Sequence, residues 1–406
     1  VMKRLPISLV VIYVGIFILF LANTYVSYKL RPDNVLSART DTLSIEKYNV
    51  KHKKVVYGFL PYWMLSKLKY IQTDKLTHIA YFALNINEDG TIRRTDKDGN
   101  IDPGYNIWKN STTLKEFIGK AKANGVEMSL TIISHDTEIN DAFLDCTSCW
   151  VTLYNEVDEE LKTHNLKSIN LDFEYPEYTK KEKALKYSQF VAFMNKQLER
   201  GREKEGMEVI VSTFADATIK PRVTDIETLN ESADGIYVMA YDFHYSESET
   251  AGPVAPINGG GKLYNYDLTL MLNDYTKYVS PSKLILGVPY YGYNWVVESE
   301  QPYSTRIPGD DYIGYSQSQT YEFIMDTLLT IKPNVVWDPT ALSPYFSYVS
   351  PTTGSIRQVY FENSDSLKIK YELVFKYNLK GAGIWALGYD GGYQELWDVL
   401  SEQFGS

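Results

Sequence analysis

Residues 169–176 read Ile-Asn-Leu-Asp-Phe-Glu-Tyr-Pro, a stretch in which polar and apolar side chains alternate. Side chains two apart on a β-strand share a face, so Asn170, Asp172 and Glu174 point one way and the apolar residues between them point the other way. Burying three polar groups is costly, and barrel enzymes keep such groups at the carboxyl ends of their strands. The stretch therefore predicts a barrel strand that carries a site.

Similar β-rich apolar runs recur along the chain from residue 55 onward. There are eight of them, at 55–60, 76–84, 126–133, 166–173, 207–214, 235–241, 283–291 and 381–387. Most intervals between the runs have a helix-like pattern. Strands that alternate with helices, eight strands in all, predict an α/β fold of the closed (β/α)8 type, a TIM barrel.

The interval between the seventh and eighth runs is too long for a single helix. It contains Tyr/Val alternation and a turn glycine, Gly354, which are typical of β-hairpins. We therefore expect a small α+β insertion at about 294–358, beside the mouth of the barrel.

The N-terminal part of the chain has a different composition. No charged residue lies between Arg4 and Lys29, and this apolar stretch is long enough to cross a hydrocarbon core of roughly 30 Å. Residues 1–28 are therefore expected to form a membrane-spanning helix, and a cleaved signal peptide is the alternative. Residues 29–54 are polar and without apolar periodicity, which predicts a linker before the barrel domain at 55–406.

The composition excludes several classes of protein. With 44% hydrophobic and 23% charged residues, the chain is neither wholly disordered nor a polytopic membrane protein. The formal net charge of −10 leaves no basic excess that could neutralise phosphates, so no nucleic-acid partner is expected. No cluster with metal-ligand spacing and no phosphate-binding glycine loop is apparent, so neither a metal nor a cofactor is expected.

The two cysteines, Cys146 and Cys149, are separated by two residues. This is the spacing of a redox motif, but the pair lies outside any thioredoxin-like βαβ context. A local disulfide is the expectation, since an exported domain meets an oxidising compartment.

The strand at 169–176 resembles the D-x-x-D-x-D-x-E signature of glycoside hydrolase family 18, the chitinase family. The β-rich insertion after the seventh strand is also similar to that of many members. Other positions that match the family in order are Met239, Tyr241 and Asp242 at the end of the sixth strand, the run 287–292 with Tyr291, and Trp385 in the eighth strand.

The resemblance implies a retaining mechanism in which the N-acetyl oxygen of the substrate attacks the anomeric carbon. Glu174 would be the general acid and later the general base, and Asp172 would stabilise the oxazolinium-like intermediate. Tyr241 would donate its hydroxyl to the acetamide oxygen, and Trp385 would form the floor beneath the reacting sugar. The other substrate-binding positions are expected to be Asn170, Asp242, Met239 and Tyr291. Independently of the family, a glutamate beside a second carboxylate in a partly desolvated mouth should have a raised pKa.

The chain departs from the family pattern at several positions. Lys167, Ser168 and Asn170 stand where the signature has Asp, Gly and Asp, and the third strand lacks the usual Ser-x-Gly-Gly. Asn170 resembles the spore-cortex-lytic N-acetylglucosaminidases of the same family, and so does the run at 252–257. The LysM wall-binding repeats common in that branch are not found in 29–54.

These features predict a glycoside hydrolase that cleaves β-1,4 bonds at N-acetylglucosamine, with peptidoglycan ranked slightly before chitin-like glycans as substrate. The catalytic domain is expected outside the cytoplasm, anchored to the membrane, or secreted if the N-terminal segment is cleaved. A catalytically silent carbohydrate-binding barrel and an endoglycosidase for N-linked glycans are the alternatives. His135 and His244 both follow predicted strand ends and could touch substrate, although a hydrogen-bonded structural role is preferred for both. Tyr62 and Trp63 could equally line the site or pack in the core.

Overall fold

The computed structural model describes residues 54–175, 179–201 and 206–405. Residues from Lys54 onward form one compact unit. The N-terminal helix expected at 1–28 and all but the last residue of the linker expected at 29–54 lie outside the described residues. Within the described ranges, no helix combines the length and the apolar character that a membrane crossing requires.

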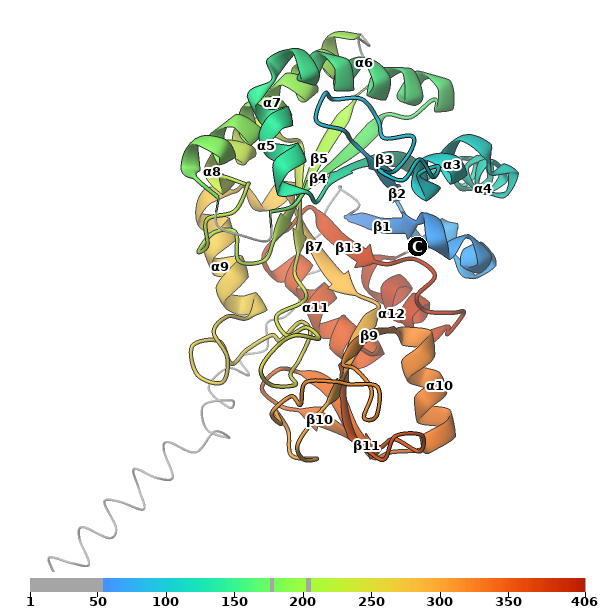
Figure 1. Cartoon of the computed structure of the whole chain (residues 1–406), viewed down its shortest axis with the longest axis vertical. Coiled ribbons are helices and arrows are strands. Elements are labelled where there is room, and N and C mark those ends of the chain that lie inside the picture. The colour runs from blue at the N-terminus through green and yellow to red at the C-terminus, as the bar shows by residue number, and fades with distance from the viewer. Residues whose placement is uncertain (1–53, 176–178, 202–205, 406) are drawn as a thin grey trace, which may run out of the picture. The chain divides into compact units, whose positions relative to one another are not determined.

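Eight parallel strands close into a barrel in the order β1-β13-β7-β6-β5-β4-β3-β2 (Figure 1). The predicted (β/α)8 barrel and its eight strands are therefore confirmed, although several strands begin or end slightly away from the predicted positions. Their bounds are β1 (Val55–Pro61), β2 (His78–Asn85), β3 (Glu127–Ser134), β4 (Ser168–Phe173), β5 (Glu208–Phe214), β6 (Gly235–Met239), β7 (Leu284–Pro289) and β13 (Gly381–Trp385).

Helices surround the barrel strands on the outside. Most begin at a short polar side chain that accepts a hydrogen bond from a free backbone N–H, for example Asp136 before α5 and Asp267 before α9. The α-helices that follow barrel strands are α3 (Pro103–Asn110), α4 (Thr112–Ala123), α5 (Thr137–Asp145), α6 (Thr147–His164), α7 (Lys181–Gly201), α8 (Ile226–Ser232), α9 (Leu268–Tyr278) and α12 (Glu395–Phe404), and α11 (Ser364–Lys376) precedes the last strand. Short 3-10 helices lie at η1 (Tyr62–Tyr70), η2 (Thr73–Lys75) and η3 (Pro281–Lys283).

The alternation along β4 gives the strand two different faces, as the sequence predicts. Phe173 points outward, where its ring lies 5.8 Å from Phe143 of α5 and 5.6 Å from Phe190 of α7, measured between ring centroids. Tyr187 of α7 donates a hydrogen bond to the backbone oxygen of Leu171. The apolar face thus binds the strand to its covering helices, and the polar face is left for the barrel interior.

The barrel interior is filled by aromatic side chains around Tyr237 of β6. This ring is fully buried and lies 4.8 Å from Phe59 of β1, between ring centroids. Glycines on β7 and β13 leave room for it, because a Cβ at Gly287 would approach its hydroxyl to 2.9 Å and a Cβ at Gly383 would approach its ring to 2.1 Å. The centre is therefore a packed core rather than a channel, and access is restricted to the barrel ends.

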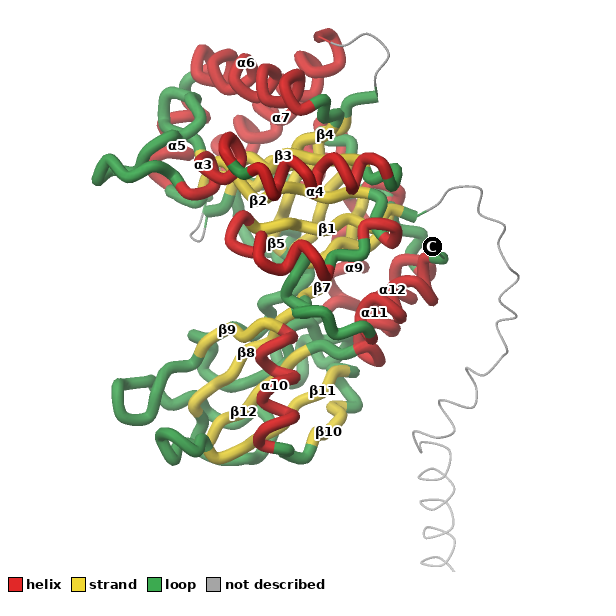
Figure 2. Tube along the Cα trace, turned by 90° about the vertical axis from the view of Figure 1, so that its right-hand side faces the viewer, coloured by secondary structure: helices red, strands yellow, loops and turns green. Residues whose placement is uncertain are grey.

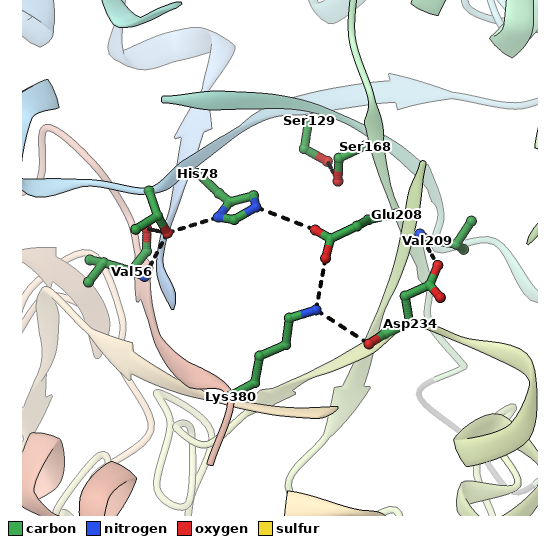
Figure 3. A network of polar contacts seen from close by, with 9 residues as sticks. Val56, His78, Ser129, Ser168, Glu208, Val209, Asp234 and Lys380 are labelled. Atoms are coloured by element: carbon green, nitrogen blue, oxygen red, sulfur yellow. Dashed lines mark hydrogen bonds and ion pairs between the residues drawn. The ribbon is translucent and has the colours of Figure 1, made fainter. Parts of the chain in front are cut away.

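The amino-terminal end of the barrel holds a polar network (Figure 3). Glu208, the first residue of β5, lies 3.4 Å from the Nε2 atom of His78 and accepts a 3.0 Å hydrogen bond from the Nζ atom of Lys380. The interaction with His78 lowers the pKa of Glu208 to about 2 against partial desolvation, and the Lys380 ammonium adds to the effect. Since barrel sites lie at the opposite end, we read this network as structural.

The insertion between β7 and β13 contains a five-stranded antiparallel sheet in the order β10-β11-β12-β8-β9. In Figure 2 the helix α10 runs along this sheet. The elements of the insertion are β8 (Tyr291–Val296), β9 (Gln317–Thr320), α10 (Tyr321–Ile331), β10 (Val335–Asp338), β11 (Ser343–Val349) and β12 (Ile356–Phe361).

The insertion begins earlier and ends later than the expected 294–358. The pairing of β8 with β12 starts at Gly292 opposite Phe361. Tyr291, expected in the seventh barrel strand, is instead the first residue of β8. The physical reason lies in Tyr290, whose N–H still donates to the backbone oxygen of Trp385 in the barrel, whereas its own oxygen accepts from the N–H of Tyr321 in the insertion.

Cys146, which lies between α5 and α6, forms a disulfide with Cys149 in the first turn of α6. Cys146 caps α6, where its sulfur also accepts from the backbone N–H of Cys149. The local disulfide expected from the sequence is confirmed.

Candidate active site

Three polar side chains follow the inner face of β4 towards its carboxyl end. Asn170 is fully buried, and its Oδ1 atom accepts a 3.1 Å hydrogen bond from Ser212 of β5. Asp172, one step further, is 3% exposed. Glu174 lies just past the strand end, where its side chain is 27% exposed. The series therefore leads from the barrel core to a carboxyl group that a substrate can reach.

A histidine from the neighbouring strand joins these carboxylates. His135 directly follows β3, and its Nε2 atom lies 3.7 Å from Oδ2 of Asp172 and 3.5 Å from Oε1 of Glu174. The side chain is 42% exposed. From the sequence, His135 could touch substrate but a structural role was preferred, and the structure places it beside the two carboxyl groups. Its position directly after the end of a strand that pairs with β4 was the available signal.

The protein environment raises the pKa of Glu174 to about 7. Desolvation is the largest cause, because it penalises the charged carboxylate, and the negative charge of Asp172 acts in the same direction. His135 opposes the shift. Glu174 can therefore hold a proton near neutral pH and release it there, which a group acting first as acid and then as base requires.

The same cluster favours the charged form of His135, whereas it favours the neutral form of Glu174. Desolvation disfavours its protonation, but the interaction with Asp172 and the charge of Glu174 outweigh this and raise its pKa to about 9. At neutral pH the imidazole is therefore a cation between two carboxyl groups. The positive charge of His135 therefore offsets part of the negative charge that Asp172 and Glu174 carry at this end of the barrel.

The segment after β6 contributes two further residues expected from the sequence. Tyr241 is 9% exposed, and Asp242 has a left-handed backbone conformation with φ of 60°. The Oδ1 atom of Asp242 accepts hydrogen bonds from the hydroxyl of Tyr291 and, at 3.0 Å, from that of Tyr293. Desolvation raises the pKa of Asp242 against these two bonds.

Tyr293 was not among the expected site residues. It is two positions after Tyr291 on β8, so both hydroxyls lie on one face and reach the same carboxylate. A Tyr-x-Tyr pair on a strand was the signal that could have found it.

Trp385 ends β13 at the carboxyl end of the barrel, next to other aromatic rings. It lies 4.7 Å from Phe82 and 5.6 Å from Phe59, between ring centroids. Phe82 also contacts Trp63, which is 45% exposed. An aromatic surface therefore extends from Trp385 towards solvent, and flat apolar rings of this kind suit the faces of sugars.

Met239 and His244, which the sequence analysis also considered, make their contacts away from the carboxylate cluster. Met239 ends β6 and is partly buried against the core. His244 is buried, and its Nδ1 atom lies 2.8 Å from the backbone oxygen of Pro253, the structural position expected for it.

Within the described residues, one group of His, Cys, Asp or Glu side chains has three donor atoms close enough together for a metal ion. Its members are His135, Asp172 and Glu174, whose donor atoms lie within 4.8 Å of one another. Sequence spacing could not predict this group, because it joins two strands. A protonated imidazole has no lone pair on Nε2, so we assign these residues as an ion-pair cluster.

Comparison with known proteins agrees with this geometry. The family model described as glycosyl hydrolases family 18 matches residues 54–390. Probable di-N-acetylchitobiase 1 of Dictyostelium discoideum is 28% identical over 323 residues, covering 73% of this chain and 81% of that protein. The cortical fragment-lytic enzyme of Bacillus subtilis is 26% identical over 259 residues, covering 62% and 53%, respectively.

Solved structures share the fold. Group IV chitinase of Ostrinia furnacalis matches with a TM-score of 0.73 and 19% identity, over 87% of this chain and 100% of that one. The spore cortex-lytic enzyme SleL of Bacillus megaterium matches with a TM-score of 0.67 and 20% identity, over 87% and 75%. On the family match, the barrel and the carboxylates of its fourth strand, this chain belongs to glycoside hydrolase family 18 and is a glycoside hydrolase.

Proposed function

We propose that the protein hydrolyses β-1,4 bonds at N-acetylglucosamine residues by a substrate-assisted retaining mechanism, with Glu174 as the acid and base. The observation that carries the proposal is the placement of Glu174. It is partly exposed at the end of β4, has a pKa raised to about 7, and lies in one cluster with the buried Asp172.

In the first step, Glu174 gives its proton to the glycosidic oxygen while the bond from this oxygen to the anomeric carbon breaks. The acetamide oxygen of the same sugar attacks that carbon, which forms a positively charged oxazolinium-like ring. The carboxylate of Asp172 stabilises this charge, and Tyr241 orients the acetamide.

In the second step, the ionised Glu174 takes a proton from water. The resulting hydroxide attacks the anomeric carbon from the face the leaving group vacated, and the acetamide is regenerated. Two inversions give net retention, and Glu174 ends protonated again.

The polymer is proposed to be a glycan rich in N-acetylglucosamine, with peptidoglycan before chitin. Relatives named for a chitobiase and for a cortical fragment-lytic activity support both choices. Asn170, which resembles the spore-cortex branch, supports peptidoglycan.

The test uses Glu174→Gln, which keeps the shape of the side chain but has no proton to give. Wild-type protein is incubated with N-acetylglucosamine oligomers and with peptidoglycan, and new reducing ends are counted. We expect at least about a 10²-fold loss of turnover in the variant, with oligomer binding retained. Glu298→Gln, an exposed site on the insertion, is the matched control and should stay active.

The outcomes separate the candidate functions. Undiminished hydrolysis by Glu174→Gln removes the catalytic assignment. Binding of oligomers by the wild type without any release indicates a carbohydrate-binding barrel instead. Activity on glycoproteins alone indicates an endoglycosidase for N-linked glycans.

The catalytic domain is further proposed to work outside the cytoplasm, held at the membrane by residues 1–28. The Cys146–Cys149 disulfide supports an oxidising compartment. Fractionation of cells that express the full chain, followed by protease treatment of intact cells, tests both points. A protected domain in the soluble fraction contradicts them.

A further inference from the structure

The residue after β3 adds a third ionisable side chain to the proposed acid and its neighbour. The Nε2 atom of His135 lies between the two carboxyl groups, 3.7 Å from Asp172 and 3.5 Å from Glu174. β3 and β4 pair in parallel, with Ser134 opposite Phe173, so this placement follows from the strand register. A one-residue slip would turn the imidazole to the other face.

Few groups around Asp172 compensate for the charge of its buried carboxylate, so a contact with protonated His135 matters there. Oδ1 of Asp172 has no hydrogen-bond partner within the described residues, and the neighbouring Asn170 is a neutral amide whose Nδ2 atom is also without one. Burial raises the pKa of the hydroxyls of Tyr187, Tyr237 and Tyr241, and the nearby charge of Asp172 acts in the same direction.

Glu174 is faced by Asp172, His135, Asp242 and Arg222. Arg222 donates to both carboxylate oxygens of Asp216 and also bonds the backbone oxygen of Tyr175, so part of its charge is already offset. His135 is the cation that the structure places in contact with both carboxyl groups.

We propose that protonated His135 is a positioning residue for the proposed reaction, holding Asp172 as a carboxylate while the adjacent Glu174 keeps its proton. The inference rests on the proposed function of Glu174. The two carboxyl groups have different tasks, and they need different protonation states at the same pH. A cation that contacts both favours the state with one negative charge over the state with none.

Removing the His135 cation is expected to move the pH profile of kcat/KM in one direction. Without His135 the buried carboxylate of Asp172 loses the cation that it contacts. The ionised form of Glu174 loses the same cation, so it holds its proton to a higher pH. The basic limb of the pH profile of kcat/KM, which follows the loss of the Glu174 proton, therefore moves to higher pH.

The experiment measures kcat/KM between pH 4 and pH 9 for the wild type and His135→Gln. We expect the basic limb of the variant to move up by about one pH unit, with His135→Lys moving it back towards the wild-type position. His164→Gln, on α6, is the control, since His164 pairs with Glu160 and not with the site. A lower rate with an unmoved profile in His135→Gln would mean a packing role only and would overturn the inference.

A second readout does not depend on turnover. NMR titration of the His135 ring is expected to give a pKa well above 6.5 in the wild type and a lower value in Asp172→Asn. A ring that titrates normally in both proteins overturns the inference even if the enzyme is active. If the ring titrates as expected but no N-acetylglucosamine polymer is cut, the proposed function fails and the pairing stands.

Discussion

At the scale of single residues, Glu174 combines two opposing requirements. A buried carboxyl is penalised when it ionises, yet the mechanism needs it to release its proton close to neutral pH. The structure meets both by leaving the side chain 27% exposed and by placing a cation and a second carboxylate close to it. Its pKa of about 7 is the balance of these contributions.

This balance predicts a stability effect of Glu174→Gln that depends on pH. The folded-state pKa is raised from 4.5 to about 7, so the stability that Glu174 contributes is fully present below pH 4.5 and is lost as the pH rises through 7. A glutamine suffers no such loss. We expect the variant to be more stable than the wild type by about 1 to 3 kcal/mol at pH 8 and similar to it at pH 4.

Urea unfolding at both pH values measures the difference. Glu298→Gln, on the exposed side of the insertion, serves as the control and should match the wild type at each pH. A stability gain of the same size at pH 4 and pH 8 would show that packing, rather than ionisation, separates the two proteins.

At the scale of elements, the two ends of the barrel carry different ionic clusters. The carboxyl end of β4 carries the carboxylates of the site, and the amino end of the adjacent β5 carries Glu208 in the polar network with His78 and Lys380 (Figure 3). Both clusters are ionic, but only the first contains a carboxyl group whose pKa is raised to near neutral. The second lowers the pKa of its carboxyl to about 2, which is what a stabilising ion pair does.

Glu208→Gln is therefore expected to destabilise the barrel without changing its chemistry. The folded-state pKa of Glu208 lies below its ordinary value, so its stabilising contribution is present above pH 4.5 and is lost as the pH falls through 2. Since the side chain is 31% exposed, solvent screening limits the expected loss at pH 7 to about 1 to 2 kcal/mol.

The loss is measured by urea unfolding at pH 7 and again near pH 2.5, where the two proteins should differ less. Glu127→Gln, at the start of β3, is the matched control at the same end of the barrel. The rate at saturating substrate should be unchanged. A large loss of activity in a folded Glu208→Gln protein would contradict the structural assignment of this network.

The strand positions were predictable because each strand has an apolar pattern of its own. The strand ends were less so, because they depend on which backbone groups find a partner across the ladder. β7 ends at Pro289 and β6 ends before Tyr241, whereas the apolar runs continue past both points. The insertion was recognisable from its hairpin pattern, but its sheet order could not be read from local sequence.

At the scale of the whole molecule, the insertion and the barrel are joined through a fully buried ion pair. Glu362 directly follows β12, and its Oε2 atom accepts a 2.6 Å hydrogen bond from Nζ of Lys370 on α11. The two side chains are 1% and 0% exposed. α11 contacts β7 and β13 of the barrel and β11 of the insertion, so the pair lies where the two parts meet.

Lys370→Met is expected to lower the free energy of unfolding by about 3 to 5 kcal/mol, because it leaves a buried carboxylate without its partner. The double variant Glu362→Leu with Lys370→Met removes both charges and should recover most of the loss. Chemical unfolding followed by tryptophan fluorescence provides the comparison. A double variant as unstable as the single one would indicate that the volume of these side chains, not their charge, matters at this junction.

The alternation along 169–176 was sufficient to place Asp172 and Glu174 on one face of a barrel strand, because side-chain direction along a strand is a local property. The eight apolar runs and the motifs at Tyr241 and Trp385 were likewise readable residue by residue. A strand end marks His135 and a Tyr-x-Tyr pair marks Tyr293 in the sequence, but neither pattern shows which side chains these residues meet. Their contacts depend on which strands become neighbours, and that is decided only when the barrel closes.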